Sequence, residues 1–497
     1  MKLKLIVWSL FFSASLPALA GTVDYHANDG GKYTSIIIKY AQKYPQARSG
    51  DKVIGAEVAD REGNILTPKK LFPLKAQTRS GDNAGDPQGL NRYYQIALPA
   101  DKQTDAKYIN QVLESLAILP QVELVYPEIP PVSIQQEQNK NKSAVQRKSL
   151  ADNEANPLDT TPDLTDTQGY LGDPAIPWSG YVMGGINWLN VKHYPGAQGE
   201  NITIISDEVH HWNTNHVDLP PSIQDFGTNI TVDSHDTRSV GIMVAKDNGF
   251  GITGIANKAR IGYAASTASA LTSAGEILKS GDVVQIGIQY TGKFCEGTRC
   301  IEGNVPMETQ SVWFDAIKSL TDRGIIVVEA AANGGLNLDD PAFEGKYDPA
   351  IRDSGAILVG AFCARSGKTA DFSNYSKRVT SASWGCDDVA TTTANGAGVS
   401  YDGGPNNQYT NSFNGTSSAN PIIAGAAASL SGYAQAKNIL LTPRQVRSIL
   451  GETGTKPKDG IDIPITIVLP GVPGPLATIG TQPDLVKAFQ AVDRLQQ

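Results

Sequence analysis

The chain lacks an excess of positive charge. Its 497 residues carry 42 Lys and Arg against 50 Asp and Glu, which gives a formal net charge of -8. Nucleic-acid binding normally needs a basic face, so this balance argues against a nucleic-acid partner. Hydrophobic residues make up 40% and charged residues 19%, an ordinary globular balance with enough apolar material for a large core.

Long uninterrupted apolar runs are scarce, and the clearest lies at the N-terminus. Two lysines precede an apolar stretch from Leu5 to Leu16, and Ala18-Leu19-Ala20 supplies the small residues that signal peptidase accepts. The run is shorter than the ~20 residues of a membrane-spanning helix. Residues 1–20 are therefore interpreted as a cleaved signal peptide and not as an anchor. We expect a secreted protein, extracellular or periplasmic, with no membrane attachment after cleavage.

Cysteine is also scarce, with four residues at positions 295, 300, 363 and 386. An oxidising compartment would allow two disulfides, and four cysteines permit three pairings. Proximity favours Cys295–Cys300 and Cys363–Cys386. The spacings lack the short Cys-x-x-Cys pairs of a structural zinc site, which makes such a site the weaker interpretation.

Residues 21–130 are predicted to form a small α+β domain. Arg92–Leu98 has the pattern of a strand, Ala106–Leu119 that of an amphipathic helix, and Val122–Tyr126 that of a second strand. Taken alone, a strand–helix–strand unit is a common building block and indicates no function.

Residues 131–166 differ sharply in composition. Gln, Asn, Lys, Ser, Asp and Thr dominate, and hydrophobic periodicity disappears. Such a stretch cannot bury enough apolar surface to offset its ordering entropy, so we predict a flexible linker. Exposed linkers are natural cleavage sites, and four basic residues make this one a candidate processing region: Lys140, Lys142, Arg147 and Lys148.

Residues 167–497 are predicted to form one α/β domain. Continuous apolar runs alternate with helical segments near Val240, at Met307–Arg323 and after Ser417. This alternation is typical of a parallel sheet covered by helices on both faces, with ligands bound at the carboxyl ends of the strands. The predicted strands are Ile202–Ile205, Val283–Ile288, Ile325–Val328 and Ala356–Val359.

The strongest chemical signal is Asn414-Gly-Thr-Ser-Ser-Ala-Asn-Pro-Ile-Ile-Ala-Gly425. Gly415 permits a tight turn, and Ser417 begins a small-residue helix, where unpaired backbone N–H groups favour a developing oxyanion. An ordinary helix-capping serine would fit the composition equally well. The motif, however, closely resembles the nucleophile motif of the subtilases, a family of serine peptidases, Gly-Thr-Ser-x-Ala-x-Pro.

His235 is the candidate general base among six histidines. Its segment, His235-Asp-Thr-Arg-Ser-Val-Gly-Ile-Met-Val-Ala245, resembles the subtilase histidine motif, although Asp236 replaces the usual glycine. A structural histidine at a helix start is the plainer alternative. His216-Val-Asp-Leu219 is interpreted as structural, and a zinc site from His210, His211 and His216 has an unusual ligand spacing.

Asp207 is predicted to be the acid of the triad. It follows the strand Ile202–Ile205, and the order Asp, His, Ser along the chain is that of the subtilases. Glu208 and Val209 depart from the family's Asp-Ser/Thr-Gly pattern, and an ordinary strand-end aspartate is the alternative. We hypothesise that the acidic neighbours Glu208 and Asp236 shift activity to higher pH; a helix N-terminus that simply favours a carboxylate is the alternative.

Asn333 is the candidate oxyanion donor. Ala330-Ala-Ala-Asn333 resembles the subtilase segment Ala-Ala-Gly-Asn, with Ala332 in the glycine place. A turn asparagine before Gly334 is the alternative interpretation.

The resemblance implies a subtilisin-like fold with a parallel sheet of about seven strands, and peptide-bond hydrolysis through an acyl-enzyme. Substrate polypeptides would lie extended beside Gly287, Ile288 and Gln289. Residues 21–130 would be a pro-domain that assists folding and acts as an intramolecular inhibitor. The resemblance implies no required cofactor; calcium is common in the family, and no acid-rich loop marks a site for it.

Two other functions remain open. An inactive subtilase fold could be kept for binding peptides or cell-surface partners. A sedolisin would share the Gly-Thr-Ser nucleophile but use a Glu–Asp pair, which His235 argues against.

Overall fold

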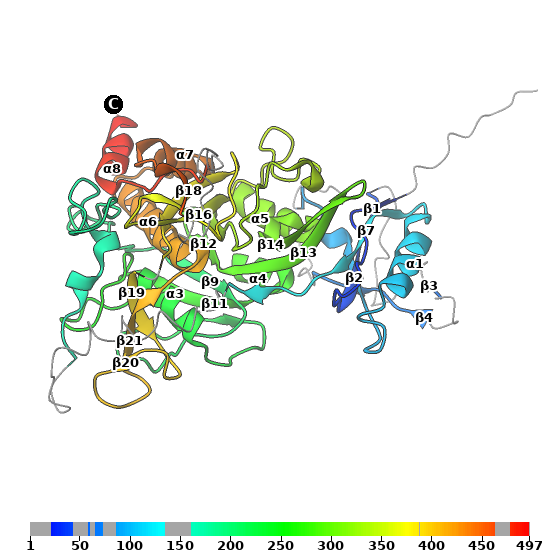
Figure 1. Cartoon of the computed structure of the whole chain (residues 1–497), viewed down its shortest axis with the longest axis horizontal. Coiled ribbons are helices and arrows are strands. Elements are labelled where there is room, and N and C mark those ends of the chain that lie inside the picture. The colour runs from blue at the N-terminus through cyan, green and yellow to red at the C-terminus, as the bar shows by residue number, and fades with distance from the viewer. Residues whose placement is uncertain are drawn as a thin grey trace, which may run out of the picture. The chain divides into compact units, whose positions relative to one another are not determined.

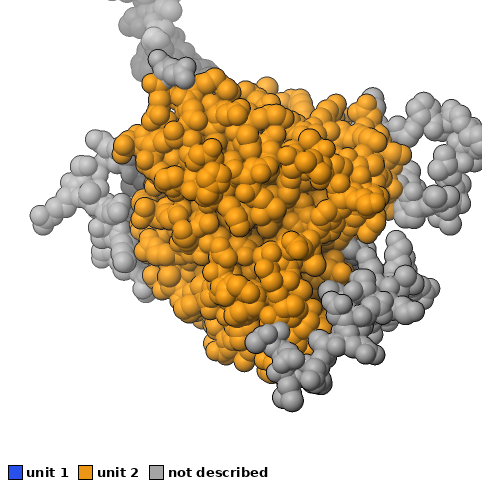
Figure 2. Space-filling view, turned by 90° about the vertical axis from the view of Figure 1, so that its left-hand side faces the viewer, with its two compact units in different colours: residues 1–73, 91–128 blue, residues 74–90, 129–497 orange. Residues whose placement is uncertain are grey.

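The computed structural model describes residues 21–42, 58–59, 65–72, 86–134, 161–386, 388–462 and 478–496. The predicted signal peptide and residues 135–160 of the predicted linker lie outside the described residues. The chain divides into two compact units, residues 1–73 with 91–128 (unit 1) and residues 74–90 with 129–497 (unit 2). Figure 2 looks onto unit 2, drawn in orange.

Unit 1 contains a five-stranded sheet in the order β1-β7-β2-β6-β5 and one α-helix, α1. The predicted strand–helix–strand segment is confirmed as β6, α1 and β7 (Figure 1). α1 begins where Asp105 accepts a hydrogen bond from the backbone N–H of Tyr108 (2.9 Å). The elements are β1 Thr22–Val23, β2 Ser35–Tyr40, β3 Val58–Ala59, β4 Ile65–Leu66, β5 Lys69–Lys70, η2 Leu90–Arg92, β6 Tyr93–Ala97, α1 Ala106–Ala117 and β7 Val122–Glu128.

Unit 2 is built on a nine-stranded sheet. Seven strands run parallel, as predicted: β10 Asp225–Phe226, β11 Arg260–Ala265, β9 Thr203–Glu208, β12 Val283–Ile286, β15 Ile326–Ala330, β16 Ile357–Cys363 and β18 Val379–Trp384. The edge adds β17 Lys368–Ala370, which is antiparallel to β16, and β22 Lys458–Asp462. The central strands are buried throughout, which is why their sequences are nearly continuous apolar runs.

Helices cover both faces of this sheet (Figure 1). On β12, Gln285 donates a hydrogen bond to Asn420 of α6 (2.8 Å), whereas on β15 Glu329 accepts one from the backbone of Glu308 (2.9 Å), in the turn before α5. Gln285 is level with Val328 in the ladder. Glu329 follows Val328 and therefore points to the opposite face, because side chains alternate along a strand. The helices are α3 Ser234–Val244, α4 Ala268–Gly275, α5 Ser311–Asp322, α6 Thr416–Ala436, α7 Pro443–Thr453 and α8 Leu485–Arg494, with short 3-10 turns η3 Thr165–Thr167, η4 Gly169–Leu171, η5 Met307–Thr309 and η6 Pro341–Phe343.

Two small sheets accompany the main one. The first is the hairpin of β13 Ile288–Glu296 and β14 Arg299–Val305, to which β8 Val132–Ser133 adds an antiparallel strand. The second joins β19 Val389–Thr393, β20 Val399–Ser400 and β21 Gln408–Phe413. Because β8 belongs to unit 2, the predicted linker boundary at residue 131 is wrong by a few residues: the chain is still ordered by strand pairing at Val132 and Ser133.

The other end of the predicted linker is shorter too. Thr161 exchanges a hydrogen bond with Asn407 (3.0 Å), and Leu164 donates its backbone N–H to Gly251 (2.7 Å), so residues 161–166 already belong to unit 2. Among the described residues, no helix is both long and apolar enough to cross a membrane.

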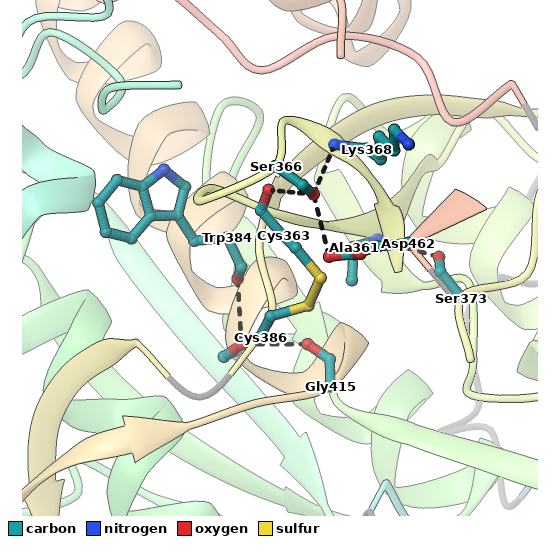
Figure 3. Close-up of a disulfide and its surroundings, with 10 residues drawn as sticks. Ala361, Cys363, Ser366, Lys368, Ser373, Trp384, Cys386, Gly415 and Asp462 are labelled. Carbon is teal, nitrogen blue, oxygen red and sulfur yellow. Dashed lines mark hydrogen bonds between the residues drawn. A yellow bond between two sulfur atoms is a disulfide. The ribbon is translucent and has the colours of Figure 1, made fainter. Parts of the chain in front are cut away.

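Both favoured disulfides are present, Cys295–Cys300 across the β13–β14 hairpin and Cys363–Cys386 between the end of β16 and the segment after β18. Figure 3 shows the second of these beside Gly415, which begins the turn into α6. Gly415 donates its backbone N–H to Gly385 (2.9 Å), the residue before Cys386. The disulfide therefore anchors the segment on which that turn rests.

Candidate active site

Ser417 lies in the first turn of α6, fully buried. The preceding Gly415 has φ +86°, a left-handed conformation that favours glycine, and a Cβ there would come within 2.9 Å of Asn333 Nδ2 and 3.0 Å of Ser417 Oγ. Both the backbone conformation and the lack of space for a Cβ therefore require glycine at position 415, in the tight turn predicted from the sequence. It leaves the Ser417 hydroxyl beside backbone N–H groups that have no partner within the helix.

Asn333 follows β15 and is held firmly in place. Its Oδ1 accepts hydrogen bonds from the backbone N–H (3.0 Å) and the hydroxyl (2.9 Å) of Thr416, and its own N–H donates to Gln289 Oε1 (2.9 Å). The side-chain nitrogen Nδ2 is buried and has no hydrogen-bond partner among the described residues. A buried donor without a partner is costly, and here it faces the space above Gly415 and beside Ser417.

Ala332, immediately before Asn333, has φ +72°. The sequence placed this alanine where the related segment has glycine, and the conformation gives the reason for glycine there. An L-residue with a side chain is strained in this region by about 1–2 kcal/mol.

His235 lies in the first turn of α3, where Asp233 accepts a hydrogen bond from its backbone N–H (2.7 Å). Its Nδ1 bonds to Asp236 Oδ1 at 2.9 Å, and Oδ2 of the same carboxylate accepts the backbone N–H of His210 (2.8 Å). Nε2 is buried without a hydrogen-bond partner among the described residues. The helices that carry His235 and Ser417, α3 and α6, pack against each other.

The acid facing His235 is Glu208, not the predicted Asp207. Glu208 Oε2 is 3.7 Å from His235 Nδ1, whereas neither carboxylate oxygen of the buried Asp207 has a hydrogen-bond partner among the described residues. The reason is strand parity. Ser206 bonds to Gln285 on the α6 face (2.9 Å), so Glu208, two residues later, leaves β9 on that face and Asp207 on the other.

Glu208 is closely confined. Its Oε1 accepts a hydrogen bond from Gln285 Nε2 (3.1 Å), and a Cβ at Gly287 would lie 2.0 Å from that same oxygen. Glycine at position 287 is therefore needed for the carboxylate to fit. The sequence predicted Gly287 as a substrate contact, and the structure shows that Gly287 packs against the Glu208 carboxylate.

The carboxyl groups here resist ionisation. Burial raises the pKa of Glu208 well above its usual range, and the neighbouring Asp236 carboxylate raises it further. Burial also raises the pKa of Asp236, against a lowering contribution from its hydrogen bond with His235. Burial alone raises the pKa of Asp207 well above its usual range. The sequence named Asp236 as an acidic neighbour of His235, and the structure shows its carboxylate in direct contact with the imidazole.

The remaining histidines named in the sequence are engaged separately. The rings of His210, His211 and His216 bond to different partners, namely Asn229, Asp225 with the Trp212 carbonyl, and the Gln408 backbone. They do not gather into the zinc site considered as an alternative. Among the described residues, the group with ligand atoms close enough to hold a metal ion is Glu208, His235 and Asp236, all within 4.8 Å of one another.

The predicted substrate-binding residues Ile288 and Gln289 start strand β13 and pair with the chain itself. Ile288 is level with Ser133 and Gln289 with Val132 in an antiparallel ladder. Beyond this pairing, the Ser417 hydroxyl lies 3.0 Å from the carbonyl oxygen of Ile134 and 3.1 Å from that of Asn414. The edge of β13 thus receives an extended peptide that leads to the serine.

A comparison with known families matches residues 185–462, more than half of the chain, to the family described as the subtilase family, Peptidase_S8. The chain belongs to the subtilase family. It is 30% identical over 239 residues to Subtilisin Savinase of Lederbergia lenta, covering 47% of this chain and 73% of that protein. An alkaline protease of Alkalihalobacillus alcalophilus is likewise 30% identical over 239 residues, 52% of its length.

Among solved structures, fervidolysin from Fervidobacterium pennivorans, described as a keratinolytic enzyme related to subtilisin, has a TM-score of 0.54 at 17% identity. The match covers 95% of this chain and 63% of fervidolysin. At that identity the likeness supports the subtilisin-like fold alone. As a subtilase, the chain is a serine-type endopeptidase, and the substrates of its family are polypeptides.

Proposed function

We propose that this subtilase is a secreted endopeptidase that hydrolyses peptide bonds through an acyl-enzyme on Ser417. The observation that carries the proposal is the surroundings of the Ser417 hydroxyl. The partnerless Nδ2 of Asn333 and the hydroxyl both border the space above Gly415, and the carbonyl oxygen of Ile134 accepts the hydrogen bond of the hydroxyl at 3.0 Å. A binding protein would have no use for a buried amide donor left without a partner.

His235 would act as the general base. In the proposed step its unpartnered Nε2 takes the Ser417 proton as Oγ attacks the carbonyl carbon, and then returns the proton to the leaving amine. The carboxylates of Glu208 and Asp236 both lie at Nδ1, where they would fix the tautomer and stabilise the imidazolium. This pair takes the role that the sequence assigned to Asp207.

Asn333 would donate from Nδ2 to the oxyanion, together with the backbone N–H of Ser417. Losing such a donor costs about 2.7–4 kcal/mol in the barrier, a value measured in subtilisin itself. The bonds from Thr416 and Gln289 fix the amide beforehand, so little reorganisation is needed during the reaction.

Location, maturation and cofactors complete the proposal. Residues 1–20 would direct secretion, to the extracellular space or the periplasm, and residues 21–130 would inhibit the enzyme until cleaved away. The side chains named above account for the chemistry, so we propose that no cofactor is required. Dialysis against EDTA is then expected to leave kcat unchanged, and a calcium requirement for folding would appear as a lower Tm.

The test is covalent labelling of the matured enzyme with a fluorophosphonate, beside casein hydrolysis. Wild type should be labelled and active, and Ser417→Ala should lose both. Ser431→Ala is the matched control, because Ser431 is also buried in α6 but bonds to the Gly281 carbonyl (2.7 Å). A folded wild-type protein that is neither labelled nor active would contradict the proposal and favour the alternative of a peptide- or surface-binding protein.

A further inference from the structure

Three ligand atoms of the kinds that bind zinc meet on the Nδ1 side of His235. They are Nδ1 itself, Oε2 of Glu208 and Oδ1 of Asp236, all within 4.8 Å of one another. Nδ1 lies 2.9 Å from Oδ1 and 3.7 Å from Oε2. Two ligand atoms of a tetrahedral zinc ion, at bond lengths of about 2.0–2.2 Å, lie about 3.3–3.6 Å apart. The three atoms are therefore close to the spacing of a zinc site.

The Glu208 carboxylate has one oxygen to spare for a ligand. Oε2 is buried and accepts no hydrogen bond from the described residues, although Oε1 accepts one from Gln285 (3.1 Å). The nearby Ser239 hydroxyl donates instead to the backbone carbonyl of His235 (3.4 Å). A buried carboxylate oxygen without a partner is costly, and a cation between Oε2 and Nδ1 would supply that partner.

The charge of the group selects the kind of cation. Two ionised carboxylates and a neutral imidazole carry two negative charges, and all three side chains are buried. A divalent ion would neutralise them, which removes the cost of holding like charges together in the interior. Imidazole with carboxylates suits Zn²⁺ and related transition metals, whereas Ca²⁺ takes six to eight oxygen ligands. Solvent lies close to this side, since His210, whose N–H bonds to Asp236 Oδ2 (2.8 Å), is half-buried.

We propose that Glu208, His235 and Asp236 form an inhibitory site for a transition-metal ion such as Zn²⁺. The inhibitory effect rests on the function proposed above, in which Nδ1 carries the imidazole proton and Nε2 accepts the proton of Ser417. An ion bonded to Nδ1 takes the place of the proton there, and that proton moves to Nε2. Nε2 then has no free electron pair, so the serine loses its base. A proton held by either carboxylate is released to solvent as the ion binds.

The first experiment measures binding without activity. The full-length Ser417→Ala chain, which lacks the proposed nucleophile, is freed of metal with EDTA and titrated with Zn²⁺ by calorimetry and with Co²⁺ by visible absorption. One ion should bind per chain, and Co²⁺ should show the strong visible bands of four-coordinate cobalt. Glu208→Gln, His235→Ala and Asp236→Asn in the same background should each weaken Zn²⁺ binding at least about tenfold. Affinities equal to that of the parent chain would overturn the site.

Two exposed residues provide matched controls for binding elsewhere on the surface. His193→Ala and Asp247→Asn each remove a residue of the same type as a proposed ligand, and both should bind Zn²⁺ as the parent chain does. Circular dichroism checks that each variant is folded. Where a ligand variant does not fold, the parent chain alone decides, because a lack of four-coordinate cobalt bands contradicts the site.

The second experiment measures inhibition of the matured wild-type enzyme with a short peptide p-nitroanilide that has no metal-binding side chain. Saturating Zn²⁺ should lower kcat at least about 100-fold, as expected for loss of a general base, and EDTA should restore it. KM should change by less than about threefold, because the ion lies behind the imidazole and not on the peptide edge. Ca²⁺ at the same concentration should leave kcat unchanged. Inhibition through KM alone would overturn the mechanism.

Asp236→Asn links the two experiments. The variant keeps part of its activity and should need at least about tenfold more Zn²⁺ for half inhibition than wild type. The same Zn²⁺ dependence in both enzymes would contradict the proposal. Failure of labelling and casein hydrolysis counts against the proposed function, whereas an active enzyme whose chain binds no Zn²⁺ counts against this inference alone.

Discussion

Asp207 and Glu208 are neighbours in β9, yet their carboxylates leave the sheet on opposite faces. Both are fully buried, and burial raises the pKa of each. Of these two residues, Glu208 is the one that lies near the imidazole of His235, 3.7 Å from Nδ1. Which of these two acids can interact with His235 is therefore decided by the face of the strand from which its side chain leaves, and not by whether it is Asp or Glu.

A matched pair of neutral substitutions separates the two acids. Glu208→Gln should lower kcat at least about 100-fold, because it removes a negative charge that stabilises the imidazolium. Asp207→Asn should change kcat by less than about threefold. Steady-state kinetics on a peptide substrate, with circular dichroism as a check of folding, distinguishes them, and the opposite ranking would restore Asp207 as the acid.

Asp236 should set the acidic limb of the activity profile. Burial raises the pKa of Glu208 and the Asp236 charge raises it further. A protonated Glu208 has no negative charge to stabilise the imidazolium, so activity falls as pH drops through that raised pKa. Asp236→Asn removes the charge and should move the acidic limb of kcat/KM toward lower pH, with a lower plateau because the bond to Nδ1 weakens. If the acidic limb of the kcat/KM profile does not move, Asp236 acts only within the first turn of α3 and does not affect Glu208.

Ala332 is a strained residue whose replacement should stabilise the protein. Ala332→Gly relieves the φ of +72°, offset in part by the greater freedom of glycine in the unfolded chain, for a net gain of about 0.5–1 kcal/mol in unfolding free energy. Ala331→Gly, one residue earlier, should lose a similar amount. Chemical denaturation of both in the Ser417→Ala background avoids self-digestion, and destabilisation by Ala332→Gly would count against the strain.

At the residue scale the sequence motifs predicted the catalytic residues, and those roles stay predictions; of the two acids on β9, the structure brings Glu208 and not Asp207 near His235. Ser417, His235 and Asn333 were identifiable because their motifs also dictate local backbone, such as the left-handed Gly415. The acid was not, since every residue of β9 is buried and hydrophobic alternation gives no clue to parity. The predicted strand also ended at Ile205, three residues before its observed end.

At the scale of elements, the entry into α6 rests on the Cys363–Cys386 segment. The Ser418 hydroxyl donates to the carbonyls of Trp384 (3.1 Å) and Gly415 (3.0 Å), two residues that Figure 3 shows near the disulfide. The disulfide closes a loop with a sequence separation of 23 residues. Its contribution is therefore both to stability and to the position of the serine turn.

Removing that disulfide should affect stability and catalysis together. The Cys363→Ala/Cys386→Ala variant should lose about 3 kcal/mol of unfolding free energy and several-fold in kcat. Cys295→Ala/Cys300→Ala is the control, because it opens a separation of only 5 residues at the tip of a hairpin. It should cost about 2 kcal/mol and leave kcat close to wild type. Equal kcat losses in the two variants would argue against a specific role for the first disulfide.

The elements themselves were largely predictable. The strands β12, β15 and β16 were expected from apolar runs, and α1 from its helical periodicity. Strand β8 was not predictable. Its two residues, Val132 and Ser133, are too few to show a strand pattern, and they become a strand by pairing with β13.

At the scale of the whole molecule, buried acids should make stability fall as pH rises. Burial raises the pKa of Asp218 from 3.8 to about 7, and raises those of Asp207 and Glu329 well above their usual range. Above pH 4 the unfolded chain has released these protons while the folded chain retains them. The unfolding free energy therefore decreases as pH rises from about 4 through 7.

Thermal unfolding of the Ser417→Ala protein checks this expectation. Tm should be higher at pH 5 than at pH 8, and Asp207→Asn should narrow the difference by raising Tm at pH 8. A Tm that increases between these pH values would show that other groups dominate.

The fold class was predictable because parallel buried strands and intervening helices leave strong periodic signals. The apolar runs indicated four strands, and the figure of about seven came from the family resemblance, whereas the sheet has nine. The division at residues 128 and 129 also lies close to the predicted boundary at 130. The assignment of residues 86–90 to unit 2 could not be predicted from composition, because it depends on contacts such as the hydrogen bond from Gln88 to Asp322 (2.7 Å).

Gly287 links the protonation of Glu208 to the binding of a peptide along β13. The Glu208 carboxylate packs against Gly287, and the next residue, Ile288, begins strand β13, which pairs with β8. A peptide that pairs with β13 and shifts Gly287 would also change the surroundings of the Glu208 carboxylate, and therefore its pKa. Because coupling between two binding equilibria is reciprocal, protonation of Glu208 must then change the affinity for the peptide. Long peptides that fill the edge and short esters that do not should therefore report different apparent acid constants for the same enzyme.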